Sequence, residues 1–311
     1  MSDNISVIIP FYNSIKTLPA LLDSILNGDL VPSEVILVDD GSTDASKDLV
    51  LEYAKKHSCI KYLSQKHSGV SAARNLGLSN ANGTWISFLD ADDFIEPDMY
   101  STMLEAVTDN TGVEGCICGY FTHKEGIVTP YSFSSSEILS SKDILKAMFT
   151  DDSVRGFLFT RLFRSDLLKD VSFNQGVFLC EDLLFQTQLF SAKDVTFAVV
   201  KKPLYHYVQS PESITGKTSF FSNNTFSYKP AYDLISQYIQ DDYVKYSYNE
   251  ILNFSMYTLI KSYRQDHDKK TLAQIRLLQK EMRQESLSFQ RKSRRRLIYE
   301  TAPVLFSHFI S

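Results

Sequence analysis

Acidic residues crowd one short stretch of the chain. The segment from Ser87 to Asp98, SFLDADDFIEPD, holds five acids among twelve residues and begins within an apolar run typical of a buried strand. Asp90 and Asp92 form an Asp-x-Asp pair, and carboxylate oxygens are the ligands that hard divalent cations prefer. Phosphate oxygens of a ligand can complete the coordination shell. The spacing therefore predicts a site for Mn²⁺ or Mg²⁺ together with a phosphorylated ligand.

Two other classes of site use similar acids. An EF-hand loop starting at Asp90 would need Gly and Glu where this chain has Ile95 and Ser101, so that class is excluded. Haloacid-dehalogenase-type phosphatases also carry Asp-x-Asp after a strand. Their motif usually continues to Thr or Val, where this chain has Phe94, and it usually lies near the start of the fold.

A third alternative assigns the acids to a solvated turn and a helix cap. In that case Asp93 is an exposed turn residue rather than an additional functional acid. Glu96 and Asp98 are expected to cap the helix that follows.

Strand-like and helix-like segments alternate over the first ninety residues. Runs rich in β-branched residues predict buried strands, and the segments between them carry helical apolar spacing. The expected strands are 5–12, 34–40, 60–65 and 84–90, and the expected helices are 14–28, 41–57 and 69–83. This order predicts a parallel sheet with right-handed crossovers, in which ligands bind at the carboxyl ends of the strands.

Polar residues follow three of these strands. Asn13 comes after the first strand, Asp39 and Asp40 end the second, and Asp90 and Asp92 follow the fourth. Because the carboxyl ends of parallel strands lie at one edge of a sheet, these side chains are expected to converge there. This convergence carries more weight than any single motif.

Four motifs in this order closely resemble those of family 2 glycosyltransferases with the GT-A fold. They are SVIIPFYN, VDDGSTD, GVSAARNLG and FLDADD. The resemblance implies an α/β domain with a Rossmann-like, mostly parallel central sheet flanked by helices, at 1–217. Within it, 1–105 would bind a nucleotide-sugar and 106–217 would bind the acceptor. A C-terminal helical add-on domain is expected at 218–311.

The resemblance also implies a UDP-sugar donor. One carboxylate of VDDGSTD would accept a hydrogen bond from the uracil N3–H, a role left open between Asp39 and Asp40. Arg74 would lie near the uracil and the phosphates. The expected nucleotide-sugar-binding residues are Pro10, Tyr12, Asn13, Asp39, Asp40, Arg74, Asp90 and Ala91.

The implied metal ligands are Asp90, Asp92 and His206, with Mn²⁺ or Mg²⁺ as the cofactor. His206 lies in PLYHYV and could instead be a core residue among aromatics. The segments 195–200 and 203–208 are expected to be short strands. Residues Ser210, Ser213 and Lys217 follow in a loop that could order over the donor.

The second half resembles the bacterial surface-polysaccharide branch of the family through RGFLFTRLFRSDLL and FNQGVFLCEDLLFQ. Glu181 and Asp182 match the position of the catalytic base, with Asp182 as the candidate. The alternative is a helix N-terminus, where the helix dipole favours acids. Arg161 follows Thr160 where this branch usually has Asn-Lys, so the charge is kept with a different geometry. Arg161 and Glu181 are expected to contact acceptor or donor.

The predicted activity is inverting transfer of a hexose or N-acetylhexosamine from a UDP-sugar to a hydroxyl of a glycan. The acceptor would be carried by a lipid or a protein, in bacterial surface glycan or adhesin glycosylation. The alternative is a non-catalytic nucleotide-sugar-binding subunit that supports a partner transferase. The presence of both LDADD and CED argues against it, because a binding subunit need not keep a base.

Composition limits the remaining possibilities. Hydrophobic residues make up 43% of the 311 residues, enough for a core, and the net charge of −5 gives no case for nucleic-acid binding. The four cysteines are expected to be free thiols in a reducing compartment. Neither a signal peptide nor a transmembrane run is recognised, so a cytoplasmic location is expected, with peripheral contact at the inner face of the membrane as an option.

The C-terminal part becomes helical and then basic, ending in RKSRRR at 291–296 beside an apolar stretch. This segment could form an amphipathic helix on anionic lipid. A solvated basic face and a contact in a homo-oligomer are the alternatives.

Overall fold

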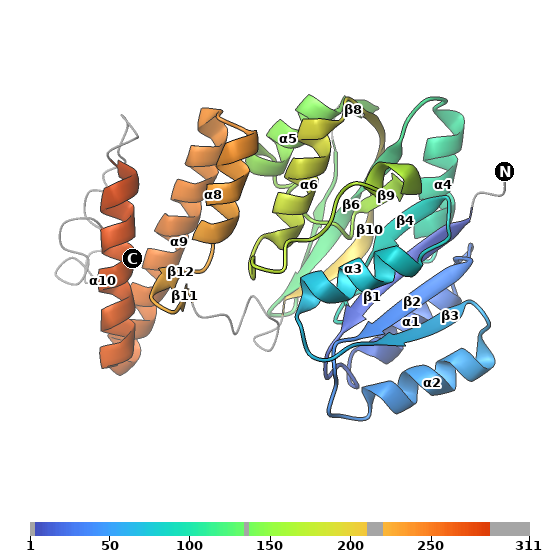
Figure 1. The fold of residues 1–311 in the computed structure, drawn as a ribbon, viewed down its shortest axis with the longest axis horizontal. Coiled ribbons are helices and arrows are strands. Elements are labelled where there is room, and N and C mark those ends of the chain that lie inside the picture. Colours follow the sequence, from blue (N-terminus) through green and yellow to red (C-terminus); the bar gives the residue numbers. More distant parts are fainter. Residues whose placement is uncertain (1–3, 134–136, 210–219, 287–311) are drawn as a thin grey trace. The chain divides into compact units, whose positions relative to one another are not determined.

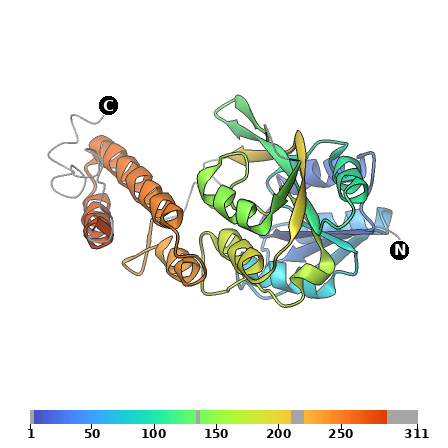
Figure 2. The same ribbon diagram turned by 90° about the horizontal axis from the view of Figure 1, so that it is seen from above.

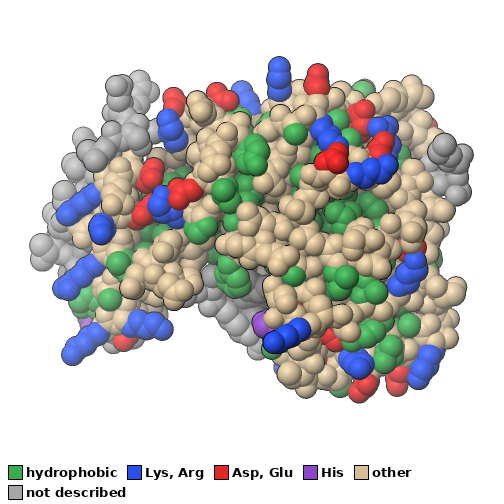
Figure 3. Space-filling model, in the orientation of Figure 1, with side chains coloured by type: hydrophobic (Ala, Val, Ile, Leu, Met, Phe, Trp, Pro, Cys, Tyr) green, Lys and Arg blue, Asp and Glu red, His purple; other side chains and the backbone are tan. Residues whose placement is uncertain are grey.

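The computed structural model describes residues 4–133, 137–209 and 220–286 of the chain. Two compact units follow one another along the sequence, Met1–Lys217 and Thr218–Ser311. Figure 1 and Figure 2 show the elements of each unit in two views. On the face drawn in Figure 3, acidic and basic side chains are interspersed.

A mixed sheet organises the first unit. Its strands run in the order β3-β2-β1-β4-β9-β6-β10-β5, with β7 paired to β6 and β8 paired to β10. Their bounds are β1 (Ile5–Phe11), β2 (Glu34–Asp39), β3 (Ile60–Ser64), β4 (Trp85–Phe88), β5 (Phe94–Ile95), β6 (Gly115–Lys124), β7 (Ile127–Tyr131), β8 (Ile138–Ser140), β9 (Arg161–Arg164) and β10 (Thr196–Gln209).

The predicted parallel sheet is confirmed in the first four strands. β1 pairs in parallel with β2 and with β4, and β2 pairs in parallel with β3. Residues 106–217 add the parallel pair β6 and β10, while β9 lies antiparallel between β4 and β6. The carboxyl ends of β1, β2 and β4 therefore lie at one edge of the sheet.

Helices cover both faces of this sheet, which explains why β1, β2 and β4 are buried along their whole length. The helices of the unit are α1 (Leu18–Leu26), α2 (Ser46–Lys56), α3 (Val70–Asn80), α4 (Met99–Asp109), α5 (Ser141–Thr150), the 3₁₀ turn η1 (Ser165–Leu168) and α6 (Glu181–Ala192). Alternate residues such as Val7 and Ile9 pack with α1, α2 and α4, while Ile36 and Val38 pack against α3. At Gly77 a Cβ atom would meet Cγ2 of Ile8 at 2.4 Å, so α3 approaches β1 closely only because this residue is glycine.

The two short strands expected around Pro203 are instead one strand, β10. Its pairing with β6 continues through Gln209, and register shifts occur between Val200 and Pro203 and between Pro203 and Tyr205. Proline lacks the N–H that a regular ladder needs, and a bulge accommodates it without ending the strand.

Within residues 220–286, the described part of the second unit, the chain is helical apart from one short hairpin. It contains β11 (Phe221–Ser222), β12 (Thr225–Phe226), α8 (Lys229–Tyr238), α9 (Asp242–Asp266) and α10 (Lys269–Ser286). Its buried apolar residues include Leu252, Met256, Ile275, Leu278 and Met282. The basic segment 291–296 lies outside the described residues, as do Ser210, Ser213 and Lys217.

The structure also places the cysteines and shows the composition of the helices. The four cysteines are free, with Cys116 and Cys118 buried and Cys59 and Cys180 half-buried. Among the helices of the described ranges, none combines the length and apolar composition needed to cross a membrane.

Candidate active site

The turn after β1 is tied to the turn after β2. Asn13 has a φ of 51°, and its Oδ1 accepts hydrogen bonds from the backbone N–H groups of Thr43 at 2.7 Å and Asp44 at 3.3 Å. Its own N–H donates to Oγ of Ser42 at 3.0 Å. Pro10 is buried within β1 opposite Val38. These two predicted nucleotide-binding residues thus shape the edge of the sheet through backbone and turn contacts.

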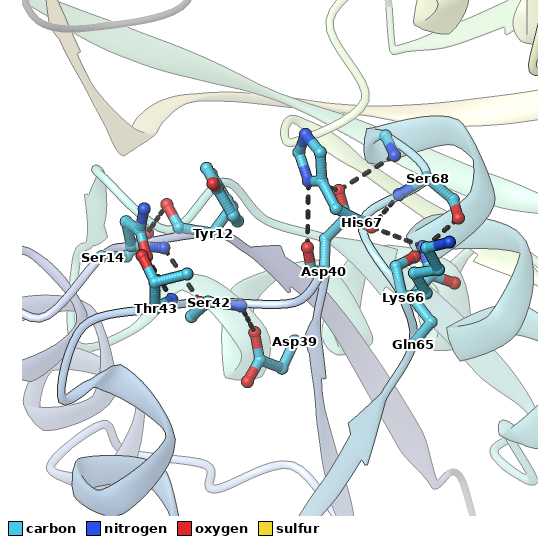
Figure 4. Close-up of polar contacts among 12 residues, drawn as sticks. Tyr12, Ser14, Asp39, Asp40, Ser42, Thr43, Gln65, Lys66, His67 and Ser68 are labelled. Carbon is cyan, nitrogen blue, oxygen red and sulfur yellow. Dashed lines mark hydrogen bonds and ion pairs between the residues drawn. The ribbon is translucent and has the colours of Figure 1, made fainter.

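The adjacent acids Asp39 and Asp40 have different surroundings. Asp39 accepts hydrogen bonds from the backbone N–H of Ser42 at 2.7 Å and from the hydroxyl of Tyr62 at 2.9 Å. Both partners belong to the framework, so Asp39 stabilises the turn that follows β2. Figure 4 shows Asp39 bonded to Ser42 and Asp40 directed instead toward the loop between β3 and α3.

Asp40 is enclosed by that loop. Its Oδ1 accepts from Nε2 of Gln65 at 2.7 Å and from the backbone N–H of Ser68 at 2.8 Å. Its Oδ2 accepts from the backbone N–H of Gly69 at 2.9 Å and lies 2.9 Å from Nδ1 of His67. His67 is thus a contact at this site that the sequence motifs did not indicate.

The loop can lie this close to the end of β2 because of Gly41. This residue has a φ of 80°, and a Cβ atom there would meet the backbone N of His67 at 2.9 Å. Beyond the loop, the ring of His67 lies against Tyr12, with ring centroids 4.4 Å apart and an interplanar angle of 31°. Tyr12 itself is 45% exposed.

Arg74 joins the two acidic motifs. Its Nη2 donates to Oδ1 of Asp90 at 2.9 Å, and its Nη1 donates to Oε1 of Glu181 at 2.7 Å. The side chain is buried, and its guanidinium lies 5.5 Å from the ring centroid of Phe173. The sequence predicted contacts to a nucleotide, and the structure places Arg74 between the Asp-x-Asp turn and the start of α6.

Asp182 lies in the first turn of α6 beside this bridge. Its Oδ1 accepts a hydrogen bond from the backbone N–H of Leu183 at 2.7 Å. Burial and the neighbouring Glu181 raise the pKa of Asp182 to about 7, although Arg74 acts in the opposite direction. A carboxyl whose pKa lies near neutrality is suited to accept a proton from a reacting group.

The three acids after β4 have separate environments. Burial and the charge of Asp90 raise the pKa of Asp92 to about 6, although a backbone hydrogen bond acts in the opposite direction. Asp93, considered above as an exposed turn residue, is only 1% exposed. It accepts hydrogen bonds from the hydroxyl of Tyr205 at 2.5 Å and from the backbone N–H of Val208 at 2.7 Å. The exposed-turn interpretation of Asp93 is therefore wrong.

The same contacts fix the Asp-x-Asp turn on β10. The hydroxyl oxygen of Tyr205 accepts the backbone N–H of Asp90 at 3.3 Å while its proton goes to Asp93. Ala91, between the two motif acids, is 9% exposed. These hydrogen bonds anchor the backbone of the turn that carries Asp90 and Asp92.

The donor set fits a hard divalent cation. The side chain of Asp90 is 35% exposed, and the pKa of the neighbouring Asp92 is raised by burial and by the charge of Asp90. Two carboxylates alone are an incomplete shell, and within the described residues no group of three or more His, Cys, Asp or Glu is arranged to hold a metal. A cation here would therefore need further oxygen ligands from a bound phosphate.

His206 does not fit the metal set. Its Nε2 lies 2.7 Å from Oε1 of Glu96, and its Nδ1 lies 2.8 Å from Nε2 of His123. The ring is stacked on Phe94 with centroids 4.2 Å apart and on Phe121 at 4.6 Å. Both ring nitrogens are engaged by protein partners, so a metal ion could bind His206 only by displacing Glu96 or His123. Glu96 pairs with this histidine rather than capping the next helix with its side chain.

Arg161 is also placed differently from expectation. It is fully buried, and its guanidinium donates to the carbonyl oxygens of Val154 at 3.0 Å and Arg155 at 2.6 Å and to Oγ1 of Thr160. All of these acceptors lie in the chain leading to β9. Arg161 therefore holds that segment in place and does not present its charge to a ligand.

Family and structural comparisons agree with this geometry. The model of the family described as "Glycosyl transferase family 2" matches residues 6–171. The chain is 35% identical to EpsH of Bacillus subtilis over 213 residues, covering 65% of this chain and 60% of EpsH. It is 33% identical to the cholesterol galactosyltransferase of Borreliella burgdorferi over 243 residues, covering 72% of this chain and 65% of that protein. The chain thus spans about two thirds or less of these relatives.

Solved structures of S. aureus TarS residues 1–349 share the fold. The complex with UDP-GlcNAc superposes with a TM-score of 0.68 at 21% identity, covering 98% of this chain and 89% of that chain. The complex with UDP gives a TM-score of 0.65 at 22% identity, with the same coverage. The mixed sheet of the first unit is therefore a GT-A fold.

Proposed function

The chain belongs to glycosyl transferase family 2, and we propose on that basis that it transfers a sugar from a UDP-sugar to a hydroxyl of a glycan. The observation that supports this best is the grouping at one sheet edge. Asp40 with Tyr12, the pair Asp90 and Asp92, and Asp182 all lie there, and Arg74 bonds both to Asp90 and to Glu181, the neighbour of Asp182. TarS, which has the same fold, was crystallised with UDP and with UDP-GlcNAc.

In the proposed donor complex, Asp40 reads the uracil. Asp39 is engaged by Ser42 and Tyr62 within the framework, whereas Asp40 has an exposed histidine as one of its partners. A carboxylate only accepts hydrogen bonds, so it favours a base that presents an N–H group. Asp40 is therefore our choice between the two acids.

Asp90 and Asp92 would hold Mn²⁺ or Mg²⁺ together with the diphosphate. When bound, such a cation supplies neutralisation of the negative charge that grows on the leaving diphosphate. The crowding of Asp92 by burial and by Asp90 supports this assignment, because a cation offsets the repulsion that raises the pKa of Asp92. Arg74 keeps Asp90 oriented by its bond to Oδ1.

Asp182 would act as general base. The acceptor oxygen forms a bond to the anomeric carbon, the bond from that carbon to the β-phosphate oxygen breaks, and the hydroxyl proton passes to the carboxylate of Asp182. One base and one leaving group imply a single displacement with inversion. General-base catalysis of this kind contributes about 10²–10⁴-fold.

The finer parts of the proposal concern substrate and location. We propose a hexose or N-acetylhexosamine as the sugar and a lipid- or protein-linked glycan in bacterial surface assembly as the acceptor. The transfer reaction would take place in the cytoplasm. If the acceptor is lipid-linked, it would take place at the inner face of the membrane.

A screen of UDP-sugars with UDP release as readout tests the proposal. The protein is incubated with Mn²⁺ and each donor in turn, with and without glycan acceptors. Release of UDP from one or a few donors is expected. Metal-dependent UDP binding with no turnover of any donor would contradict the transferase assignment and indicate a nucleotide-sugar-binding subunit.

A further inference from the structure

His67 joins two groups that a nucleobase would need. Its ring lies on Tyr12 with centroids 4.4 Å apart, and its Nδ1 lies 2.9 Å from the carboxylate of Asp40 and 3.0 Å from the carbonyl oxygen of Asp40. A nucleobase bound by stacking on this aromatic ring and by hydrogen bonding to this carboxylate would use the same two contacts. Figure 4 shows the ring of His67 above Asp40.

The carboxylate of Asp40 has no unused capacity while His67 is in place. Ionised carboxylates offer about four acceptor positions. Gln65 and the backbone N–H groups of Ser68 and Gly69 donate three hydrogen bonds to them, and Nδ1 of His67, which is hydrogen-bonded to the Asp40 carbonyl oxygen, covers the fourth position at 2.9 Å from Oδ2. A fifth donor from a ligand therefore requires one of these to leave.

His67 is the partner that can leave at least cost. Two of the others are backbone groups at the start of α3, and their release would disturb the loop. The side chain of His67 is 60% exposed, whereas that of Asp40 is only 6% exposed. Rotation of the His67 side chain into solvent breaks its two contacts without moving the backbone.

The short distance between the rings leaves no space for a base between them. A nucleobase that stacks on the face of Tyr12 covered by His67 must therefore displace it. We propose that His67 occupies the nucleobase position of the unliganded protein and that UDP binding displaces its side chain. The inference rests on the proposed UDP-sugar donor and identifies a specific residue that sets the affinity for it.

The expected effect follows from the two contacts of His67. When the binding-competent form is only a fraction of the population, the apparent dissociation constant rises by the inverse of that fraction. The ring contact of His67 with Tyr12 and its hydrogen bond to Asp40 are both exposed to solvent. Together they favour the arrangement in which His67 covers Tyr12 by about three- to tenfold. Removing the side chain should therefore tighten UDP binding by the same factor.

Isothermal titration calorimetry with UDP and Mn²⁺ tests this on the full chain. His67→Ala is compared with the wild-type protein and with His57→Ala. His57 is a suitable control because it also lies beside a tyrosine, with its ring centroid 6.2 Å from that of Tyr53 at the end of α2. The dissociation constant is expected to fall about three- to tenfold in His67→Ala and to stay unchanged in His57→Ala.

The outcomes separate the inference from the proposed function. Equal or weaker UDP binding by His67→Ala, with normal binding by the wild type, would overturn the displacement of His67 and leave the donor assignment intact. An absence of UDP binding by all three proteins would overturn both.

Nuclear magnetic resonance of the wild-type protein gives a second readout. The chain has six histidines, so the imidazole C–H signals can be assigned by loss of one signal in each variant. Ring-current shifts from Tyr12 are expected for His67 in the free protein and should disappear as UDP is added. A His67 signal that does not move at saturating UDP would overturn the inference.

Discussion

Replacing Arg74 should destabilise the first unit and reveal what holds its two acidic motifs together. Arg74 is 5% exposed and bonds to Asp90 at 2.9 Å and to Glu181 at 2.7 Å. Arg74→Met keeps most of the apolar length and removes the charge, which leaves two carboxylates without their shared partner. Breaking a buried ion pair by removing one partner costs about 3–5 kcal/mol.

The exposure of the partners sets the value within that range. The side chain of Glu181 is 13% exposed and that of Asp90 is 35% exposed, so water can compensate Asp90 in part. We therefore expect a loss of about 3 kcal/mol in the free energy of unfolding. For a unit of this size that corresponds to a fall of about 6–12 °C in Tm.

The loss should also depend on pH in a defined direction. The pKa of Asp182 is raised to about 7, so the folded protein binds more protons than the unfolded chain, and stability falls as pH rises through this window. Arg74 lowers this pKa, so its removal raises the pKa of Asp182 further and extends the fall to higher pH. The loss in the free energy of unfolding caused by Arg74→Met should therefore be larger at pH 8 than at pH 5.

Thermal unfolding followed by circular dichroism at the two pH values measures both effects. Arg164→Met is the matched control because Arg164 makes an exposed ion pair with Asp166 at 2.7 Å, and exposed pairs contribute about 0–1 kcal/mol. If Arg74→Met unfolds at the same temperature as Arg164→Met, the bridge does not stabilise the site and the reasoning is wrong.

Three further predictions concern the acids and their partners. Turnover should rise with pH through about 7 as Asp182 loses its proton, because a base must be ionised to act; a rate that falls over this range would contradict the assignment. Asp92→Ala should weaken UDP binding in Mn²⁺ by at least about tenfold while binding without metal changes little; calorimetry with and without EDTA measures the difference, and equal losses in both conditions would exclude a metal role. Tyr205→Phe should lower the free energy of unfolding by about 1–3 kcal/mol, because buried Asp93 loses a donor; urea denaturation checks this, and an unchanged midpoint would show that the bond is dispensable.

Local patterns were sufficient to predict the first four strands of the sheet. The runs that became β1, β2 and β4 are mostly apolar because helices cover both faces of the sheet, and their order along the chain with β3 fixed the parallel arrangement. The positions of Asp90 and Asp92 at the end of β4 followed from the same pattern.

The position of β9 and the surroundings of His206 and Arg161 could not be predicted, because they depend on contacts between segments that lie apart in the sequence. β9 is inserted between β4 and β6, and no periodicity in its four residues indicates those neighbours. The partners of His206 come from β6 and from the turn before α4, so its engagement by both ring nitrogens could not be inferred from PLYHYV. Arg161 was predicted from its charge, but its acceptors are carbonyl oxygens, which no motif encodes.

His67 shows the opposite case, in which a chemically informative residue lay between two recognised motifs. It stands two residues after Gln65 and two before Gly69, at the end of a strand that was correctly predicted. The sequence gives no sign that its ring reaches back to Tyr12 and Asp40. That contact exists because β1 and β3 both flank β2, which brings the ends of all three strands together.

The turnover of Asp182→Asn tests the proposed transferase activity most directly. UDP release from the donor identified by the screen is measured together with UDP affinity, and Asp48→Asn serves as a control because Asp48 also lies in the first turn of a helix. We predict that Asp182→Asn lowers turnover by about 10²–10⁴-fold while UDP affinity stays within a small factor of the wild type. Near-normal transfer by Asp182→Asn would contradict the assignment of the base.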